Sequence, residues 1–440
     1  MIYSLPPEET ERKIASREIK IAVIGLGRVG LPLAATLADE GVEVVGVDIN
    51  EEIITKISIG ESPYIDEAGL KELIQRVVAK KTFKATSQIQ AIKECDFIII
   101  AVPTLIRGEE PEIDAVQLVA DELAQNFSQG KVVVLQSTVP PFTTQNILGK
   151  VIEERTGLKP GRDFGLAYSP ERTQAPQVLR DLKAYPKIVG GIDEKSTSIV
   201  SMIYSTFAPS ILKMGSIAAA EIEKVIENAY RDVNIAFANE LARICEIYGI
   251  DVYEIIRVAN SQPYSHILSP GLVGGHCIPV DPYYIISDAR ERGVIPKLMQ
   301  TAREVNESVF QHVVDMVDEG LSKITILGLS FKEDIKSFET SHTLKLVRLL
   351  VEKRYDVTVH DPFLDGTQFQ FKTDPNLYHA IDGSDCVILS TAHSEYGQID
   401  FRKVKQIMRG DLVIDIRGVF HPQEVWKHGL KYKGIGRILR

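Results

Sequence analysis

The chain has 440 residues, of which 44% are hydrophobic and 25% charged, a balance typical of a globular protein with two or three domains. Its 50 basic and 60 acidic side chains give a formal charge of −10, which offers no general attraction to nucleic acid or to an anionic membrane. Apolar stretches such as 97–102 are far shorter than the roughly 20 residues of a membrane span. Four cysteines without paired spacing predict no zinc site, and we expect a cytoplasmic protein without a metal.

The first half of the chain alternates between predicted strands and helices. Residues 1–18 are polar, and we expect them to form a short arm. Residues 20–48 predict a strand, a glycine-rich turn, a helix and a second strand. Further apolar segments at 97–102, 132–135 and 187–189 are predicted strands with helical patterns between them. This alternation predicts a parallel sheet that is covered on both faces.

The first motif is the glycine-rich turn that follows the strand IAVI. It consists of Gly25, Leu26, Gly27, Arg28, Val29 and Gly30. In a dinucleotide-binding fold the three glycines allow a tight turn, approach of the backbone to a pyrophosphate, and close packing of helix on strand. Asp48 ends the second strand, where a carboxylate accepts a hydrogen bond from a ribose hydroxyl, and no Arg follows it. The motif predicts NAD rather than NADP, and the alternative is a structural turn without a ligand.

A different pattern begins at 221. Apolar residues recur at three- and four-residue spacing to 248 without Gly or Pro, which predicts one long helix. At about 1.5 Å per residue, such a helix is on the order of 40 Å long and can link two domains. Lys224, Asn228, Arg231 and Asn239 share one of its faces. This polar stripe is either a solvated surface or a set of donors for an oxyanion.

The second motif is the loop SPGLVGGHCIPVDPYY at 269–284, which contains Cys277. The other three cysteines lie beside predicted strands or in the long helix, where buried thiols are usually inert. A nucleophilic thiol must reach its substrate and be partly ionised, and this rigid loop has little apolar sequence around the thiol. We therefore expect Cys277 to be a nucleophile. His276 either assists it or only forms hydrogen bonds.

The last section repeats the strand and turn pattern of the first. KITILGLSF begins at Lys323, and the segments 92–104 and 381–393 both place an Asp before an apolar strand and a turn. The second half has Gly328 and Ser330 at the positions of the first two turn glycines. We predict an α/β protein with two Rossmann-like, doubly wound domains, joined by the long central helix, with the site in the cleft between them. The predicted boundaries are 1–18 for the arm, 19–212 for the NAD-binding domain, 213–315 for the central helical domain with the cysteine loop, and 316–440 for the last domain.

Together these residues resemble the UDP-glucose/GDP-mannose dehydrogenase family over nearly the whole chain. The resemblance rests on IAVIGLGRVGLP, STVP at 137–140, SPER at 169–172, RDVNIAFANEL at 231–241 and GGHCIPVDPYY at 274–284. Within the family, RDVNIAFANEL, GGHC and TAREVNE at 301–307 are most similar to the branch that acts on UDP-N-acetyl-D-mannosamine. The chain departs from the family where Glu339 and Tyr264 or its neighbours stand in place of two arginines.

The resemblance implies oxidation of carbon 6 of a UDP-N-acetylhexosamine to the uronic acid with two NAD. It implies that Cys277 carries a thiohemiacetal and a thioester, and that Lys224 and Asn228 stabilise the oxyanion. It further implies that Asp281 assists proton transfer and that Thr138 and Glu171 position a water. The implied cofactor contacts are residues 25–30, Asp48, Thr104 and Thr138. The implied substrate contacts are Glu171, Arg172, Lys224, Asn228, Gly274, Gly275, Lys332 and Arg417, the last two toward UDP.

Several alternatives stay open at this point. UDP-N-acetylmannosamine is the favoured substrate, with UDP-N-acetylglucosamine and UDP-glucose as alternatives. A simpler alcohol or hydroxyacid dehydrogenase would not need Cys277, and a catalytically silent nucleotide-sugar binding protein would form no NADH. The family also implies a homodimer or a larger homo-oligomer, and we expect a homodimer through the central helices. It further implies a supply of uronic acids for polysaccharides or glycans.

Overall fold

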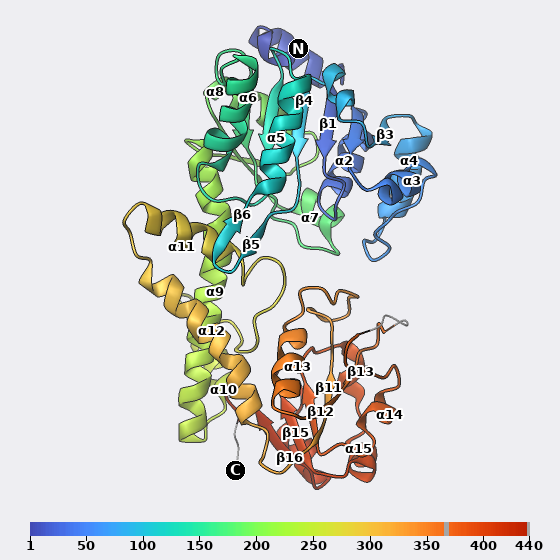
Figure 1. Ribbon diagram of the computed structural model, residues 1–440, viewed down its shortest axis with the longest axis vertical. Helices are drawn as coiled ribbons and strands as arrows, with labels where there is room; N and C mark the ends of the chain where they lie inside the picture. Colours follow the sequence, from blue (N-terminus) through green and yellow to red (C-terminus); the bar gives the residue numbers. More distant parts are fainter. Residues whose placement is uncertain (365–368, 438–440) are drawn as a thin grey trace. The chain divides into compact units, whose positions relative to one another are not determined.

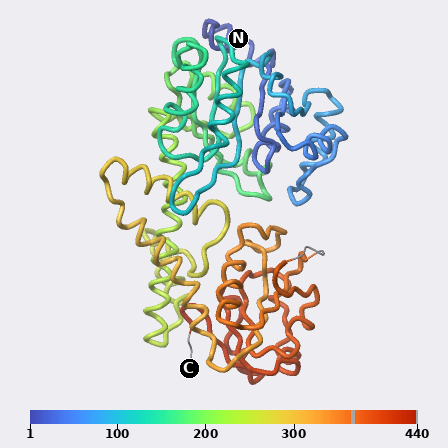
Figure 2. The backbone as a smooth tube through the Cα atoms, in the orientation of Figure 1, coloured from blue at the N-terminus to red at the C-terminus, as the bar shows by residue number. Residues whose placement is uncertain are grey.

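The computed structural model describes residues 1–364 and 369–437. The chain divides into two compact units. Unit 1 comprises Met1–Glu227 and Tyr283–Val294, and unit 2 comprises Asn228–Pro282 and Ile295–Arg440. Figure 2 traces the backbone through both units, from blue at the N-terminus to red at the C-terminus.

The sheet of unit 1 has eight strands among the described residues, in the order β10-β9-β8-β7-β4-β1-β2-β3. They are β1 (Lys20–Ile24), β2 (Glu43–Val47), β3 (Phe83–Thr86), β4 (Phe97–Ile100), β7 (Val132–Leu135), β8 (Gly165–Tyr168), β9 (Lys187–Gly191) and β10 (Ile211–Lys213). A small antiparallel hairpin joins β5 (Leu105–Arg107) to β6 (Glu110–Glu112).

The strands of this sheet run parallel from β3 across to β8, as predicted. The predicted strand at 187–189, β9, differs because it runs antiparallel to β8, and β10 follows its direction. The reason is the connection at 169–186. It brings the chain back beside β8 from the carboxyl end of that strand, instead of crossing over to its amino end as a parallel strand requires. The sheet is therefore mixed at this edge.

Both faces of this sheet are buried. In β1, Ile21 and Val23 belong to one core, and Ala22 and Ile24 to the other, which explains the continuous apolar runs of the sequence. The first face is covered by α2 (Gly30–Asp39), α3 (Glu51–Ser58), α4 (Leu70–Ala79), α7 (Val178–Ala184) and α8 (Glu194–Tyr204). The second is covered by α5 (Asp114–Asn126), α6 (Lys150–Thr156) and the start of α9; α5 and α6 are drawn together in Figure 1.

The N-terminal segment is packed rather than extended as an arm. It forms η1 (Ile2–Ser4) and α1 (Pro7–Ala15), and Ile2, Tyr3 and Ile14 are buried in the core of unit 1. The hydroxyl of Tyr3 also donates to the carbonyl of Gly161 at 2.9 Å. Two of these apolar side chains are adjacent at the start of the segment and one lies near its end, and they bury a stretch whose average composition is polar.

The predicted long helix is confirmed as α9 (Ile217–Tyr248), 32 residues long. It begins in unit 1 and ends in unit 2. Its first turn packs into the core of unit 1, and its last turns contribute Ala238, Ala242 and Cys245 to the core of unit 2. None of the described helices is both long and apolar enough to cross a membrane.

Unit 2 contains a second sheet, of six described strands in the order β13-β12-β11-β14-β15-β16, all parallel. The strands are β11 (Lys323–Leu327), β12 (Asp356–His360), β13 (Lys372–Thr373), β14 (Cys386–Leu389), β15 (Leu412–Asp415) and β16 (Lys431–Gly434). One face packs on the end of α9, α10 (Val252–Ala259), α12 (Lys297–Asp315) and α13 (His342–Glu352), and the other on α14 (Leu377–Ile381), α15 (Phe401–Ile407) and α16 (Pro422–Lys427). The two predicted α/β sections are thus confirmed.

Candidate active site

The glycine-rich turn of unit 1 has the geometry of a nucleotide site. Gly25 has a φ of +91°, and a Cβ there would lie 2.4 Å from the carbonyl oxygen of Ala101. A Cβ on Gly30 would lie 1.9 Å from the carbonyl oxygen of Gly25. A Cβ on Gly27, in contrast, would meet no atom within 4 Å. Packing therefore requires the outer glycines, whereas Gly27 borders open space, as a glycine under a pyrophosphate must.

Asp48 lies at the end of β2 beside this turn. Its carboxylate accepts from the backbone N–H of Leu26 at 2.7 Å and from that of Asn50 at 2.8 Å. The side chain is half-buried, so lone pairs of both oxygens remain for a ribose hydroxyl. The turn and this carboxylate together fit NAD.

Tyr64 supports the turn in a way that the sequence did not reveal. Its hydroxyl donates to the carbonyl of Leu26 at 3.0 Å, and burial, followed by the charge of Asp48, raises its pKa to about 12. Arg28 lies 5.3 Å from the Tyr64 ring and pairs with Asp66 at 2.7 Å. The Arg28 guanidinium is thus engaged by a neighbouring loop.

The structure brings Thr104 and Thr138 together beyond the ends of two adjacent strands. The Thr104 hydroxyl donates to the Thr138 carbonyl at 2.6 Å, and the Ser137 hydroxyl donates to the carbonyl of Val102 at 2.7 Å. Because ligands of open α/β sheets bind beyond the carboxyl ends of the strands, this is the position expected for cofactor contacts.

Glu221, on α9, holds the chain that follows Thr138. Its carboxylate accepts from the backbone N–H of Phe142 at 2.6 Å, and from the N–H and hydroxyl of Thr144 at 2.8 and 2.6 Å. Burial raises its pKa from 4.5 to about 7, against these hydrogen bonds. Glu221 was not among the predicted site residues, although it lies one helical turn before Lys224.

Glu171, which the resemblance links to water, is held on all sides. One carboxylate oxygen accepts from Lys187 Nζ at 2.7 Å and from Gln136 Nε2 at 2.8 Å. The other accepts from the backbone N–H groups of Arg172 and Thr173 at 2.9 and 3.0 Å. Burial raises the pKa of Glu171, but the charge and hydrogen bond of Lys187 and the two N–H groups outweigh it, so the pKa lies below its ordinary value.

Arg172 and Lys224 lie on facing elements of unit 1. The Arg172 guanidinium pairs with Glu227 on α9, with an Nε to Oε1 distance of 2.9 Å. Burial, then the neighbouring Glu227, raises the pKa of Glu223 to about 7. Lys224 is buried on the same helix. In the sequence of α9, Lys224 is therefore flanked by three acidic residues, at 221, 223 and 227.

In unit 2 the structure brings Asn228 and Asp281 together. Asn228 Nδ2 donates to Asp281 Oδ2 at 2.5 Å, and the Arg231 guanidinium donates to Asn228 Oδ1. Both Asn228 and Asp281 are buried. Asp281 begins α11 (Asp281–Glu291), and its N–H donates to the carbonyl of Cys277 at 2.8 Å. Cys277 is the exposed one of the four cysteines, and the other three are buried.

The cysteine loop is anchored at both ends within unit 2. Asn239 accepts from the N–H of Gly271 at 2.7 Å and donates to its carbonyl at 3.2 Å. The N–H of Gly275 donates to the carbonyl of Thr340 at 3.0 Å, and a Cβ on Gly274 would lie 2.8 Å from His342 Nδ1. Asn239 is therefore a structural member of the polar stripe, and Gly274 allows the close approach of the loop to α13.

The two residues predicted to contact UDP also lie near this loop. A Cβ on Gly271 would lie 3.3 Å from Arg417 Nη1. A Cβ on Gly275, which has a φ of +91°, would lie 3.3 Å from the ring of Phe331, the residue before Lys332. Lys332 and Arg417 are both partly exposed. Their side chains are thus available on segments that border the cysteine loop.

The predicted site residues are divided between the units. Thr138, Glu171 and Lys224 lie in unit 1 with the glycine turn, and Asn228 and Cys277 lie in unit 2. The boundary between the units falls within α9, between Glu227 and Asn228, so Lys224 and Asn228 lie one helical turn apart on either side of it.

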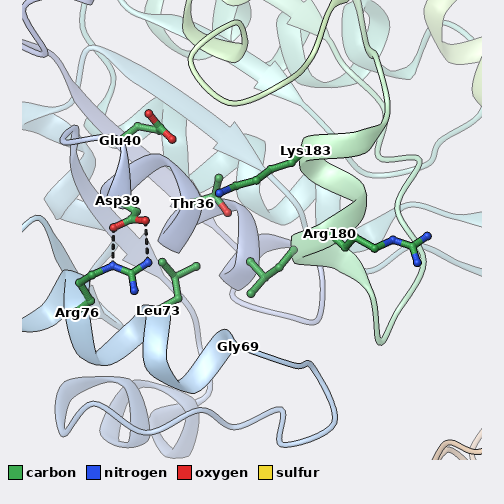
Figure 3. A pocket seen from close by; sticks show the side chains of 9 residues that line it. Thr36, Asp39, Glu40, Gly69, Leu73, Arg76, Arg180 and Lys183 are labelled. Carbon is green, nitrogen blue, oxygen red and sulfur yellow. Dashed lines mark hydrogen bonds and ion pairs between the residues drawn. The ribbon is translucent and has the colours of Figure 1, made fainter.

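A separate pocket of about 230 Å³ lies in unit 1, away from the glycine turn (Figure 3). It is lined by residues of α2, α4 and α7 and their ends: Thr36, Asp39, Glu40, Gly69, Leu73, Arg76, Leu179, Arg180 and Lys183. Arg76 donates to both carboxylate oxygens of Asp39 at 2.8 Å. None of the predicted site residues lines this pocket.

Comparison with known proteins identifies three family segments. Residues 19–208 match the NAD binding domain of the UDP-glucose/GDP-mannose dehydrogenase family, residues 218–308 its central domain, and residues 325–422 its UDP binding domain. A UDP-N-acetyl-D-mannosamine dehydrogenase of Pyrococcus horikoshii is 33% identical over 95% of this chain and 99% of its own length. An NDP-N-acetyl-D-galactosaminuronic acid dehydrogenase of Ralstonia nicotianae is 33% identical over 92% and 97%. A solved structure of UDP-D-ManNAc dehydrogenase from Pyrococcus horikoshii superposes with a TM-score of 0.89, at 32% identity over 96% of this chain and all of that one.

Proposed function

The chain belongs to the UDP-glucose/GDP-mannose dehydrogenase family and is an NAD-dependent nucleotide-sugar dehydrogenase, and we propose that it oxidises carbon 6 of a UDP-N-acetylhexosamine to the uronic acid. UDP-N-acetyl-D-mannosamine is the favoured substrate. The observation that carries the proposal is the hydrogen bond between Asn228 and Asp281 at the base of the loop that exposes Cys277.

The chemistry assigns a role to each side chain. NAD, when bound, accepts a hydride. Loss of a hydride from carbon 6 and of the proton of its hydroxyl first gives the aldehyde. The thiolate of Cys277 adds to the aldehyde carbon to give a thiohemiacetal, and loss of a second hydride from that carbon gives a thioester. Water then attacks the thioester, the carbon–sulfur bond breaks, the acid leaves, and the thiol of Cys277 is regenerated. Two hydrides leave carbon 6 and one water oxygen enters it.

The oxyanion that forms on carbon 6 needs donors. Asn228 Nδ2 carries two hydrogens, and one of them is bonded to Asp281, so the other is assigned to the oxyanion together with Lys224. Asp281 takes up a proton through a water. Glu171 and Thr138 orient the water that attacks the thioester. Lys332 and Arg417 are proposed to bind the diphosphate.

The proposal is tested by counting NADH per acid formed with UDP-N-acetylmannosamine, UDP-N-acetylglucosamine and UDP-glucose side by side. We expect two NADH per acid, and the highest kcat/KM with the first sugar. Cys277→Ala should lower turnover at least about a thousandfold, because the covalent path is lost. Cys245→Ala, at a buried cysteine of unit 2, is the matched control and should keep full activity.

Two results would redirect the assignment. Full turnover of Cys277→Ala would indicate a simpler alcohol dehydrogenase that needs no thiol. Binding of the UDP-sugars without any NADH would indicate a silent binding protein.

We also propose that the protein forms a homodimer through α9. Apolar side chains are exposed along the part of α9 in unit 2. Tyr230, Phe237 and Ile244 follow one another at a spacing of seven residues, and Ile247 and Tyr248 extend the stripe to the end of the helix. Such a stripe marks a protein contact, and a second copy of the same helix is its proposed occupant. A monomer mass in sedimentation equilibrium would contradict this.

A further inference from the structure

The environment of Glu171 assigns a role to Lys187 that its position in the sequence does not suggest. We propose that Lys187 is a positioning residue for thioester hydrolysis, which holds Glu171 as an oriented carboxylate toward the attacking water. The inference rests on the proposed function, because it concerns the water step of that reaction.

The carboxylate of Glu171 accepts four hydrogen bonds. Lys187 and Gln136 donate to one oxygen, and the backbone N–H groups of Arg172 and Thr173 donate to the other, all within 3.0 Å. The Lys187 side chain is 4% exposed and that of Glu171 is 10% exposed. The ion pair is therefore screened from most of the solvent, and about a tenth of the Glu171 side chain is accessible.

The reversed strand β9 explains how Lys187 reaches this place. The antiparallel register pairs Ala167 with Gly191 and Tyr168 with Gly190. Continued past the end of β8, this register puts Lys187 opposite Glu171. In a parallel β9 the first residue of the strand would lie beside the amino end of β8, away from Glu171. The antiparallel direction of β9 is thus what places Lys187 within reach of Glu171.

Further contacts fix the Lys187 ammonium. It lies 5.3 Å from the centre of the Tyr204 ring and 3.5 Å from the carbonyl oxygen of Pro170. The Tyr204 hydroxyl donates to Gln136 Oε1 at 3.3 Å, and Gln136 in turn donates to Glu171. The amide orientation of Gln136 is therefore set by Tyr204, and the network has one arrangement.

The other charged groups around Glu171 do not replace Lys187. Arg172, on the same loop, directs its guanidinium to Glu227 of α9. A further titratable neighbour is Tyr204 on α8, and Glu223 on α9 lies near Arg172. In the described part of unit 1, Lys187 is the one cation that forms an ion pair with Glu171.

Removal of Lys187 changes one chemical step. A carboxyl group that is buried without a cation favours its protonated form. A protonated Glu171 cannot accept a proton from water, so attack on the thioester slows, whereas the two hydride transfers before it do not require this group. The thioester then accumulates on Cys277.

The experiment mixes the full-length Lys187→Met variant rapidly with NAD and UDP-N-acetylmannosamine. We expect a burst of two NADH per active site at close to the wild-type rate, then a steady state at least about tenfold slower at pH 7. The acid limb of the kcat profile should move to higher pH. Lys187→Arg should restore the steady state, because it restores the cation.

Lys131→Met is the matched control. Lys131 is an equally buried lysine of unit 1, and its ammonium donates to the carbonyls of Ile92, Lys93 and Cys95. Its loss should lower the melting temperature without changing the ratio of burst to steady-state rate. Should Lys187→Met fail to fold, Lys187→Gln removes the charge and keeps a donor.

A second measurement does not depend on turnover. Infrared difference spectra between pH 5 and 8, with Glu171→Gln as reference, should show a protonated carboxyl band for Glu171 in Lys187→Met but not in the wild type. The absence of this band from the variant, or an unchanged ratio of burst to steady state, would overturn the inference. If the wild type forms no NADH with any of the three sugars, the proposed function fails, and the infrared result still decides the role of Lys187.

Discussion

The turn after β1 and the turn after β11 share a framework but differ in what they hold. Gly25 and Gly328 both have a φ close to +90°, and a Cβ on either would lie about as close to the chain beyond the neighbouring strand: 2.4 Å from Ala101 O and 2.5 Å from Thr391 O. In both units, therefore, a glycine lets the first strand turn against the adjacent one.

The two turns diverge within a few residues. In unit 1, α2 begins at Gly30 within the turn itself, and Gly27 borders open space. In unit 2, α13 begins only at His342, and the longer segment before it includes Thr340, which binds the N–H of Gly275. The first turn thus leaves room for a pyrophosphate, and the second supports the loop that carries Cys277.

The aspartates that follow show the same contrast. Asp361 is fully buried, and one oxygen accepts from the N–H groups of Leu329 and Ser330 at 2.7 and 2.8 Å and from His393 at 3.0 Å. Burial raises the pKa of Asp361, but His393 and the N–H groups outweigh it and lower the pKa. Asp48 has only two backbone donors and is half exposed. The aspartate of unit 2 is thus a structural anchor, whereas the aspartate of unit 1 keeps lone pairs for the proposed contact with a ribose hydroxyl.

The largest expected effect comes from Asp361→Asn. This change replaces a buried carboxylate and leaves His393 and two N–H groups poorly satisfied, which should cost about 3–5 kcal/mol of unfolding free energy. Urea unfolding measures the loss. NAD affinity, measured by fluorescence titration, should stay the same.

Asp48→Asn is the matched change in unit 1 and should behave in the opposite way. Loss of a charged acceptor for a ribose hydroxyl should weaken NAD about tenfold or more, with little change in urea unfolding. If Asp361→Asn weakened NAD and Asp48→Asn did not, the assignment of the two turns would be reversed.

A smaller difference between the units should appear with pH. Folded Glu221 keeps its proton up to about pH 7, whereas the unfolded chain loses it near 4.5, so folding binds a proton in this window. Relative to Glu221→Gln, the wild type should lose up to about 3 kcal/mol of stability as pH rises from 4.5 to above 7. Hydrogen exchange at 142–149 should speed up over this range. Equal changes in the sheet of unit 2, where Asp361 stays ionised, would contradict a local origin.

Much of the fold followed from local patterns. Glycine spacing after an apolar strand identified the turn at Gly25, and the unbroken apolar periodicity identified α9. These signals are read along one segment, so no long-range contact is needed to interpret them. The exposed position of Cys277 followed from its glycine- and proline-rich loop in the same way.

What escaped prediction depends on contacts between distant segments. The direction of β9 is set by the path of 169–186, and nothing in the apolar run at 187–189 encodes it. The ion pair of Lys187 with Glu171 also joins segments that are distant in the sequence. The same holds for the hydrogen bonds of Glu221 to Phe142 and Thr144. Asn239 shares a helix face with Lys224, but only the structure shows that its partner is Gly271 and not a ligand.

The packing of the N-terminal residues has a practical side. A recombinant version trimmed at the apparent end of the polar stretch would lose Ile2, Tyr3 and Ile14 from the interior of unit 1 and uncover the apolar surface beneath them. Such a shortened protein would be prone to self-association during purification.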